Sequence, residues 1–350
     1  MLVLGIETSC DETAAALVAD GVTVRANVIG SQIDRHRPFG GVVPEIAARA
    51  HVDLLLPTLD RALVEAGATY ADVDAVAVTA GPGLIGSLLV GVAAAKALAL
   101  AHDAPLIGVN HLEGHVCAAQ LEFGLLEPPL VALIVSGGHT SLVLGDDEGR
   151  LTTLGATLDD AAGEAFDKIA RFIGLPYPGG PEIDRLARDG DPAAVAFPRA
   201  LLHDGSYDFS LSGLKTAVVR ELRRREAAGI AVSLPDVAAS FQEALVEVQV
   251  RKTVAAAQAY GVERVTVVGG VAANSRLRAA MGEACAAAGL RLMVPSPALC
   301  TDNGAMIAAA GYNRLAAGER SALDVAADPN LGFTAVPPAP PGNRSESAAP

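Results

Sequence analysis

The sequence predicts an α/β protein built from two related halves. Short apolar runs typical of strands alternate along the chain with patterns typical of helices. Each half also opens with a strand pair joined by a polar turn, around Thr8-Ser9 in the first half and at residues 136–140 in the second. The length of 350 residues fits two such units. The repeated opening therefore indicates a duplicated architecture.

The first half should contain five strands and three helices. A long helix is expected from Pro44 to Val64, because proline is tolerated in the first turn of a helix, although Pro57 is expected to kink it. Gly81-Pro82-Gly83 breaks the chain before an alanine-rich helix at residues 86–101, and a further helix begins near His111. The strands are expected at residues 2–6, 15–18, 22–29, 75–79 and 106–109.

The second half should begin with a hairpin and continue with helices separated by two more strands. The hairpin is expected at residues 130–135 and 141–144, and the later strands at 264–268 and 290–294. The helices are expected at residues 161–173, 182–188, 236–260, 274–288 and 303–315.

The charge balance restricts what the protein binds. Acidic residues outnumber basic ones by 40 to 26, which gives a formal net charge of −14. Such a chain repels polyanions on average, so a general coat for nucleic acid or for membrane surfaces is excluded. A nucleic acid remains possible as a substrate through a local basic patch, a partner or a metal. Aromatic residues are only 4% of the chain, which argues against base-stacking platforms.

The sequence favours a soluble cytoplasmic protein. The four cysteines are scattered and include no C-x-x-C pair, which argues against a zinc knuckle or a disulfide framework. The N-terminus has no basic region ahead of its apolar run, so a signal peptide is not expected. The most apolar stretch, residues 84–101, is rich in Gly and Ala and carries Lys96, which favours a buried helix over a membrane span.

His111 and His115 are the first candidates for chemistry. At the i and i+4 positions of a helix they share one face, where two imidazoles can hold one cation. Glu113 lies about 200° away from His111 round the helix. A zinc protease instead places its glutamate directly after the first histidine, so this spacing argues against peptide hydrolysis. The alternative is two partly exposed histidines near a helix end.

Asp302 is the candidate third ligand. It stands where a strand leads into the last expected helix. Two histidines and one carboxylate with open positions form the ligand set of a catalytic metal. An aspartate at this place is also a common helix N-cap, and both alternatives stand.

Two glycine-bearing turns suit phosphate. Gly137 and Gly138, with the hydroxyls of Ser136 and Thr140, present N–H and O–H donors to an anion. Residues 269–274 end a strand in glycines before a helix, which lets a nucleotide approach the backbone and the helix N-terminus. The alternative is that both are ordinary turns, since neither matches a Walker A or dinucleotide-binding motif.

The remaining charged groups have a plain and a functional interpretation. In the plain interpretation, Asp167 and Asp184 are surface carboxylates. Lys215, Arg220 and Arg223 to Arg225 place five cations within eleven residues. Such runs are usually solvated helix faces, but in this acidic chain the run is the best candidate for contacting phosphates.

Taken together, the motifs occur in the order found in the bacterial TsaD family of tRNA N6-adenosine threonylcarbamoyltransferases. The resemblance covers about residues 1 to 320 and is matched at every motif position. The motifs are residues 5–13 (Gly-Ile-Glu-Thr-Ser-Cys-Asp-Glu-Thr), 81–83 (Gly-Pro-Gly), 110–115 (Asn-His-Leu-Glu-Gly-His), 135–140 (Val-Ser-Gly-Gly-His-Thr), 177–180 (Tyr-Pro-Gly-Gly), 269–274 (Gly-Gly-Val-Ala-Ala-Asn) and 301–303 (Thr-Asp-Asn).

The resemblance implies an actin- and Hsp70-like ATPase (ASKHA) fold with a nucleotide cleft between two lobes. The N-terminal lobe would span residues 1–128 and be completed by the helix at 302–320, and the C-terminal lobe would span residues 129–301. The tail at 335–350 is rich in proline and serine, and we expect it to be disordered.

The resemblance also implies the reaction and its participants. The threonylcarbamoyl group moves from threonylcarbamoyl-AMP to N6 of adenosine 37 in tRNAs that read ANN codons, and AMP is released. A paralogue, TsaB, forms a heterodimer with the chain, and TsaE supplies an ATPase. One divalent metal, iron(II) or else zinc, is held by His111, His115 and Asp302. The substrate nucleotide is contacted by Ile134, Val135, Ser136, Gly137, Gly138, Asp167, Gly180, Asp184 and Asn274.

Further expectations concern the proton and the partner. The attacking amine loses a proton, for which Asp11 or Glu12 in the first turn is the candidate base. The TsaB contact is expected on the helices within residues 44–101, where a charged substitution such as Ala48→Glu would break it. The alternative functions are an ATPase or kinase on the same fold and a metalloendopeptidase.

Overall fold

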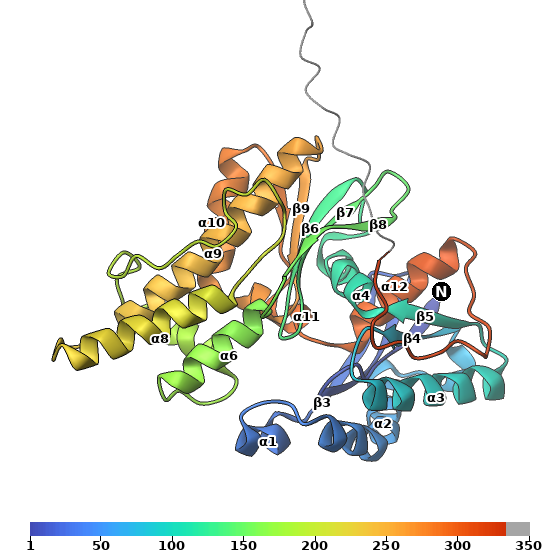
Figure 1. The fold of residues 1–350 in the computed structure, drawn as a ribbon. Helices are drawn as coiled ribbons and strands as arrows, with labels where there is room; N and C mark the ends of the chain where they lie inside the picture. Colours follow the sequence, from blue (N-terminus) through green and yellow to red (C-terminus); the bar gives the residue numbers. More distant parts are fainter. Residues whose placement is uncertain (334–350) are drawn as a thin grey trace, which may run out of the picture.

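The first five-stranded sheet is built from the N-terminal part of the chain (Figure 1). The computed structural model describes residues 1–333. The strand order is β3-β2-β1-β4-β5, in which β1 pairs antiparallel with β2 and parallel with β4. The strands are β1 (Leu2–Glu7), β2 (Glu12–Ala19), β3 (Thr23–Ser31), β4 (Ala75–Gly81) and β5 (Leu106–Asn110).

The second sheet repeats this arrangement. Its order is β10-β9-β6-β7-β8, in which β6 pairs antiparallel with β7 and parallel with β9. Both sheets therefore contain a hairpin, a third antiparallel strand and two parallel strands in the same order along the chain, which agrees with the expected duplication. The strands are β6 (Leu130–Val135), β7 (Thr140–Gly145), β8 (Leu151–Ala156), β9 (Arg264–Val268) and β10 (Arg291–Met293).

Helices cover both faces of the first sheet (Figure 1). On one face, α2 (Pro44–Ala66) and α3 (Ile85–His102) pack against β2 and β4 through a core that includes Leu59, Val78 and Val92. On the other face, α12 (Gly304–Ala316) packs against β1, β2 and β4. Contact between α12 and β1 is so close that a side chain at Gly5 would clash with the Gly304 carbonyl.

The second sheet carries a larger helical layer. Helices α9 and α10 pack on the sheet, and α6, α7 and α8 join α9 in a separate core around Phe166 and Phe241. These helices are α6 (Ala162–Phe172), α7 (Gly179–Ala187), α8 (Ser212–Ala227), α9 (Leu234–Ala259) and α10 (Ser275–Ala287). The short helices are α1 (Ile33–His36), α5 (Gln120–Phe123), α11 (Pro297–Cys300), η1 (Arg37–Phe39), η2 (Tyr70–Asp72) and η3 (Gly270–Ala273).

Helix α4 (His111–Ala118) lies between the two sheets. It follows β5 of the first sheet and packs on α12, while Leu112 and Val116 pack against Ile134 and Val268 of the second sheet. A helix in this position presents its side chains where the two halves of the molecule meet.

The structure differs from the sequence expectations in several elements. Helix α8 was not among the expected helices. Helix α2 is continuous through Pro57, where a kink was expected. Strand β8 was not expected, because it is an edge strand whose residues are mostly half-buried and show no clear alternation. Helix α3 is long and apolar enough to cross a membrane by length and composition alone, but it packs on the sheet by one face, and only 33% of it is buried. The helix expected to be buried at 84–101 is thus buried along one face.

The expected disordered tail at 335–350 lies outside the described residues.

Candidate metal and nucleotide site

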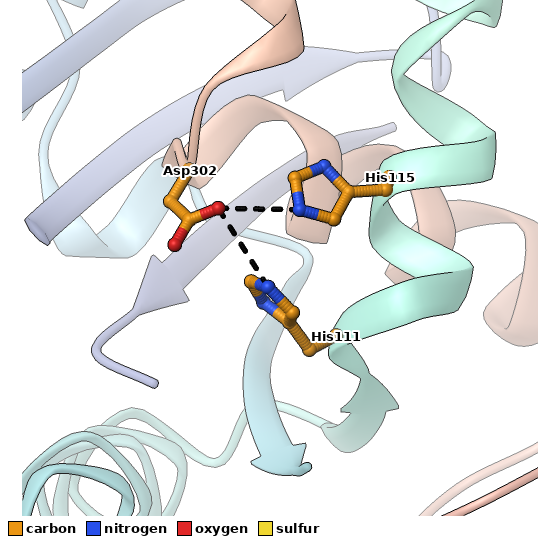
Figure 2. A group of neighbouring side chains, drawn as sticks. All are labelled: His111, His115 and Asp302. Carbon is orange, nitrogen blue, oxygen red and sulfur yellow. Dashed lines mark ion pairs between the residues drawn. The ribbon is translucent and has the colours of Figure 1, made fainter. Parts of the chain in front are cut away.

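Helix α4 presents two histidines to one aspartate (Figure 2). The helix starts at His111 because the Asn110 side chain accepts a hydrogen bond from the Leu112 backbone N–H, at 2.8 Å. One turn apart, His111 and His115 point toward Asp302, in the loop between α11 and α12. The Nε2 atoms of His111 and His115 lie 3.6 and 3.2 Å from Asp302 Oδ1. Both histidines are buried, in contrast to the alternative of partly exposed helix-end residues.

The three side chains fit a single metal ion. Their ligand atoms all lie within 4.8 Å of one another. Ligands about 2.1 Å from a tetrahedral metal are about 3.4 Å apart, close to the spacing seen here. Neither ring nitrogen of His115 has a hydrogen-bond partner in the described part of the chain, although both are buried. Buried polar atoms are normally satisfied, so the orphaned Nε2 beside Asp302 is consistent with a metal ligand.

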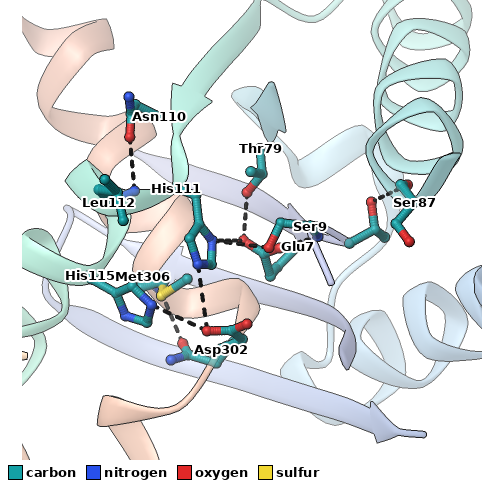
Figure 3. A network of polar contacts seen from close by, with 12 residues as sticks. Glu7, Ser9, Thr79, Ser87, Asn110, His111, Leu112, His115, Asp302 and Met306 are labelled. Atoms are coloured by element: carbon teal, nitrogen blue, oxygen red, sulfur yellow. Dashed lines mark hydrogen bonds and ion pairs between the residues drawn. The ribbon is translucent and has the colours of Figure 1, made fainter. Parts of the chain in front are cut away.

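Glu7 fixes the orientation of His111 (Figure 3). Its carboxylate is fully buried at the end of β1 and accepts hydrogen bonds from His111 Nδ1 at 2.9 Å and from Thr79 Oγ1 at 2.6 Å. With Nδ1 donating to Glu7, Nε2 is the nitrogen directed at Asp302, and it can bind a metal that displaces its proton. We did not identify Glu7 from the sequence as a site residue. The sequence signal for this role was an acidic residue within an apolar strand, because a carboxylate that is buried requires a partner.

The charges within this cluster compensate one another. Burial favours a lower pKa for His111, but the carboxylates of Glu7 and Asp302 outweigh it and raise the pKa to about 9. Burial favours a higher pKa for Asp302, but His111 and His115 hold its pKa well below the usual range. Burial also favours a higher pKa for Glu7, but His111 lowers it overall, so both carboxylates are ionised at neutral pH.

Replacing Glu7 with Gln tests its role in orienting His111. The amide keeps the shape of the side chain but loses the charge and part of its capacity to accept hydrogen bonds. We expect metal affinity to fall about 10- to 100-fold while the fold is retained. The measurement is a metal titration with elemental analysis and a thermal melt. Glu65→Gln, at an exposed carboxylate paired with Arg61, is the matched control. Unchanged affinity in Glu7→Gln would limit Glu7 to a structural role.

Glu113 is directed away from the histidines. Its carboxylate binds the Arg314 guanidinium of α12, with an Oε2–Nη2 distance of 2.7 Å. The glutamate that a helical zinc protease places beside its metal is thus absent from this helix face, in agreement with the sequence argument.

The carboxylates of the first hairpin face the same site. Asp11 lies in the turn between β1 and β2, and Glu12 begins β2, where its Oε1 accepts a hydrogen bond from Ser31 Oγ at 2.8 Å. Burial, reinforced by the negative charges of Asp11 and Asp302, raises the pKa of Glu12 to about 7. Burial also raises the pKa of Asp11. A carboxyl group that titrates near neutral pH can take up and release a proton under working conditions.

The second-half hairpin turn lies at the end of β6. Gly137 and Gly138 are exposed there, while Ser136 is buried and its Oγ accepts a hydrogen bond from the His139 backbone N–H. Ile134 and Val135 have no exposed surface. They therefore support the turn from within the sheet.

The turn after β9 lies beside this hairpin, at the carboxyl end of a neighbouring parallel strand. Gly269 adopts a positive φ of 92°, and a side chain there would clash with the Val135 carbonyl, so glycine is required for the close approach. Asn274 caps α10 by accepting from the Leu277 N–H and donates to Gln242 Oε1 at 2.7 Å. Ligands in open α/β sheets bind at such strand ends.

Two carboxylates link the helices around these turns. Asp167 on α6 accepts from the Gly179 N–H at 2.6 Å, next to Gly180. Asp184 on α7 accepts from Ser275 Oγ at 2.8 Å, next to Asn274. Burial raises the pKa of Asp167. The predicted nucleotide residues outside β6 thus belong to connected elements of the second half, and Asp184 is buried where a surface carboxylate was the alternative.

His139 connects the two groups of residues. It stands in the β6–β7 turn, and its ring lies 6.4 Å from that of His111, centroid to centroid. Burial, with the positive charge of His111 nearby, lowers the pKa of His139 to about 4, so the ring is neutral. The glycine turn and the histidine–aspartate cluster therefore face one another. We did not single out His139 as a site residue, because only the fold brings it opposite α4.

Comparison with known proteins identifies the family. The family model for TsaD, tRNA N6-adenosine threonylcarbamoyltransferase, matches residues 23–309. The chain belongs to this family. A TsaD-family protein of the same name from Symbiobacterium thermophilum is 57% identical over 332 residues, covering 95% of this chain and 97% of the relative. One from Geobacter sulfurreducens is 56% identical, covering 92% and 94%.

Solved structures show that this TsaD-family chain has the actin- and Hsp70-like ATPase (ASKHA) fold. HypF of T. kodakarensis matches with a TM-score of 0.62 at 14% identity, covering 91% of this chain and 48% of HypF. The activator of 2-hydroxyisocaproyl-CoA dehydratase from Clostridium difficile matches with a TM-score of 0.53 at 15% identity, covering 91% and 97%. At these identities the likeness concerns the fold alone.

Proposed function

We propose that this chain transfers the threonylcarbamoyl group from threonylcarbamoyl-AMP to N6 of adenosine 37 in tRNAs that read ANN codons, releasing AMP. Family membership over nearly the whole chain supports the reaction class. The observation that carries the proposal is the position of His111 opposite the glycine turn that bears His139. A cluster suited to a metal thus faces a turn suited to phosphate, and an acyl adenylate requires both.

The turns of the second half hold the adenylate. The exposed backbone at Gly137 and Gly138, with Ser136, donates hydrogen bonds to the phosphate. Asp167, Gly180, Asp184 and Asn274 surround the nucleoside. Because the acyl group is already activated, the main work of these residues is to place it beside the attacking amine.

His111, His115 and Asp302 hold one divalent metal, for which iron(II) is our first expectation and zinc the second. When bound, such a metal polarises the carbonyl or neutralises the phosphate as AMP leaves. Glu7 orients His111 from behind. His139 remains neutral opposite the cluster, so its ring adds no positive charge that would compete for the ligands.

Glu12 is the stronger of the two candidate bases. Burial raises the pKa of both Asp11 and Glu12, and it raises that of Glu12 to about 7. Glu12 is thus partly ionised at neutral pH and strong enough as a base to accept the proton that the amine loses on acylation. The check is the pH profile of transfer, whose acidic limb near pH 7 should disappear in Glu12→Gln.

The two alternative functions receive less support. A metalloendopeptidase needs a glutamate beside its metal, and Glu113 is bound to Arg314 instead. An ATPase or kinase on this fold holds Mg²⁺ through oxygen ligands, whereas the cluster here contains two imidazoles.

Mass analysis of tRNA nucleosides tests the proposed reaction. Metal-loaded protein is incubated with threonylcarbamoyl-AMP and an ANN-reading tRNA, with and without the proposed partners. We expect threonylcarbamoyladenosine and AMP in equal amounts. A transcript with guanosine at position 37 is the control. Absence of the modified nucleoside from the complete mixture, or ATP turnover or peptide cleavage as the main activity, would overturn the proposal.

The partners are TsaB, as a heterodimer, and TsaE, with cytoplasmic tRNA as the substrate. The exposed side of α2 and α3 supports a protein contact. Ile85, Leu89 and Leu100 are exposed on α3, within about 60° of one another round the helix, and Val52 and Leu56 are exposed on α2. We call these five residues the apolar face. Contiguous exposed apolar patches mark interaction surfaces.

A further inference from the structure

Helix α8 concentrates positive charge in an acidic protein. Its residues, Ser212–Ala227, include five basic and two acidic side chains, for a net charge of +3. Since the whole chain carries −14, the rest carries −14 − 3 = −17. A polyanion is repelled by most of this surface, so any favourable contact with one must be local.

The structure divides these cations into two groups. Arg224 and Arg225 both bind Glu221, at 2.8 and 2.7 Å. Hydrogen bonds from these two arginines lower the pKa of Glu221 to about 2. Lys215, Arg220 and Arg223 have no carboxylate within 4.0 Å in the part of the chain that the structure describes. Charges without an internal partner are available to an external one.

Of these, Arg220 and Arg223 lie on the outer side of the helix. Leu214 and Val218 face inward and pack in the core around Phe166. On the opposite side, one shallow hollow of about 410 Å³ is lined by Thr216, Val219, Arg220, Arg223 and Arg224. Thr216, Arg220 and Arg223 are spaced by four and then three residues, which places them on one face of the helix. Arg225, included with the others from the sequence, lies on the flank and is half-buried.

The start of α8 is tied to the region that carries the nucleotide residues. The Asp159 carboxylate accepts hydrogen bonds from the Leu211 and Ser212 backbone N–H groups, at 2.7 and 3.1 Å. Asp159 precedes α6, the helix that bears Asp167. From this anchor α8 runs beside α6 to the outer edge of the molecule, at the left in Figure 1. Sixteen residues of helix span about 24 Å, so the charged face leads outward from the site.

We propose that Arg220 and Arg223, assisted by Arg224, bind backbone phosphates of the tRNA substrate; this rests on the proposed function. Guanidinium groups bind phosphate oxygens through paired hydrogen bonds. A protein partner is disfavoured, because the hollow has only one apolar lining residue, Val219, whereas protein interfaces have an apolar core. Contacts to phosphate position an RNA without reading its sequence.

The test compares two double variants with the same change in charge. Arg220→Gln with Arg223→Gln removes the proposed contacts. Arg150→Gln with Arg251→Gln is the matched control, because both arginines are exposed in the same half of the molecule but already bind carboxylates. Equilibrium binding of unmodified tRNA to the full-length protein is measured across a salt series without adenylate. Transfer is then measured at increasing tRNA concentration.

We expect the slope of log affinity against log salt to shrink by about 1.8 in the Arg220/Arg223 variant, about 0.9 for each lost phosphate contact. Affinity should fall roughly 10-fold or more near 0.1 M salt, with a raised KM for tRNA and an unchanged kcat. The control should retain the wild-type slope. An unchanged slope in the first variant, or equal losses in both, would overturn the proposal. Because binding is measured without the reaction, a failed transfer assay would count against the proposed function alone.

Discussion

Asp302→Asn should remove the metal and abolish transfer together. The amide has nearly the shape of the carboxylate but lacks the charge that balances His111 and the metal. Loss of a direct ligand should weaken metal binding by more than the roughly 10- to 100-fold typical of residues behind the ligands. Elemental analysis of the purified protein and the transfer rate at fixed metal concentration measure the two effects. His115→Ala should behave alike.

The control for this experiment is His102→Ala. His102 stacks on Tyr70 at the end of α3 and is exposed, so its loss should alter neither metal content nor transfer. Metal binding also stabilises the native state, by about 2.7 kcal/mol at a metal concentration 100 times the Kd. The wild-type protein should therefore melt at a higher temperature with metal, and Asp302→Asn should not. Full metal occupancy in either site variant would exclude these three residues as the metal site.

Leu56→Glu with Leu89→Glu should prevent formation of the TsaB heterodimer without unfolding the chain. The two side chains are 64% and 54% exposed, so a charge there costs little in the free protein. In an apolar interface the same charge is buried without a partner. Interface anchors contribute about 2 kcal/mol or more each, so we expect at least a 10-fold weaker complex for each position. Sedimentation or titration calorimetry with purified TsaB measures the change.

Leu323→Glu, at another exposed apolar residue of the chain, is the control and should leave pairing intact.

Ala48, the position suggested by the sequence for this test, is less suitable than Leu56 and Leu89. Ala48 packs against Gly86 where α2 and α3 meet, so Ala48→Glu would disturb the helix pair itself. Undiminished pairing in the Leu56/Leu89 double variant would place the TsaB contact elsewhere.

The sequence predicted the duplicated architecture, because a strand pair around a polar turn at the start of each half leaves a local pattern. It predicted the histidine pair because i and i+4 spacing fixes a shared helix face. It did not predict Glu7 or His139 as site residues. Their roles depend on β1 lying beside β4, and on the β6–β7 turn lying opposite α4, and neither arrangement has a local pattern. The complete burial of Ile134 and Val135 was not predicted either, because a family motif does not show how its residues are packed.

The contact between α12 and β1 has a consequence for the order in which the protein is assembled during synthesis. Strands β1 to β5 leave the ribosome first, yet one face of their sheet is covered by residues 304–316, which are made only after the whole second sheet. The half that is translated first is therefore the last to finish folding. Asp302 arrives on the same returning segment, so a nascent chain holds both histidines long before it has their carboxylate. Metal capture through all three side chains can begin only after Asp302 has left the ribosome.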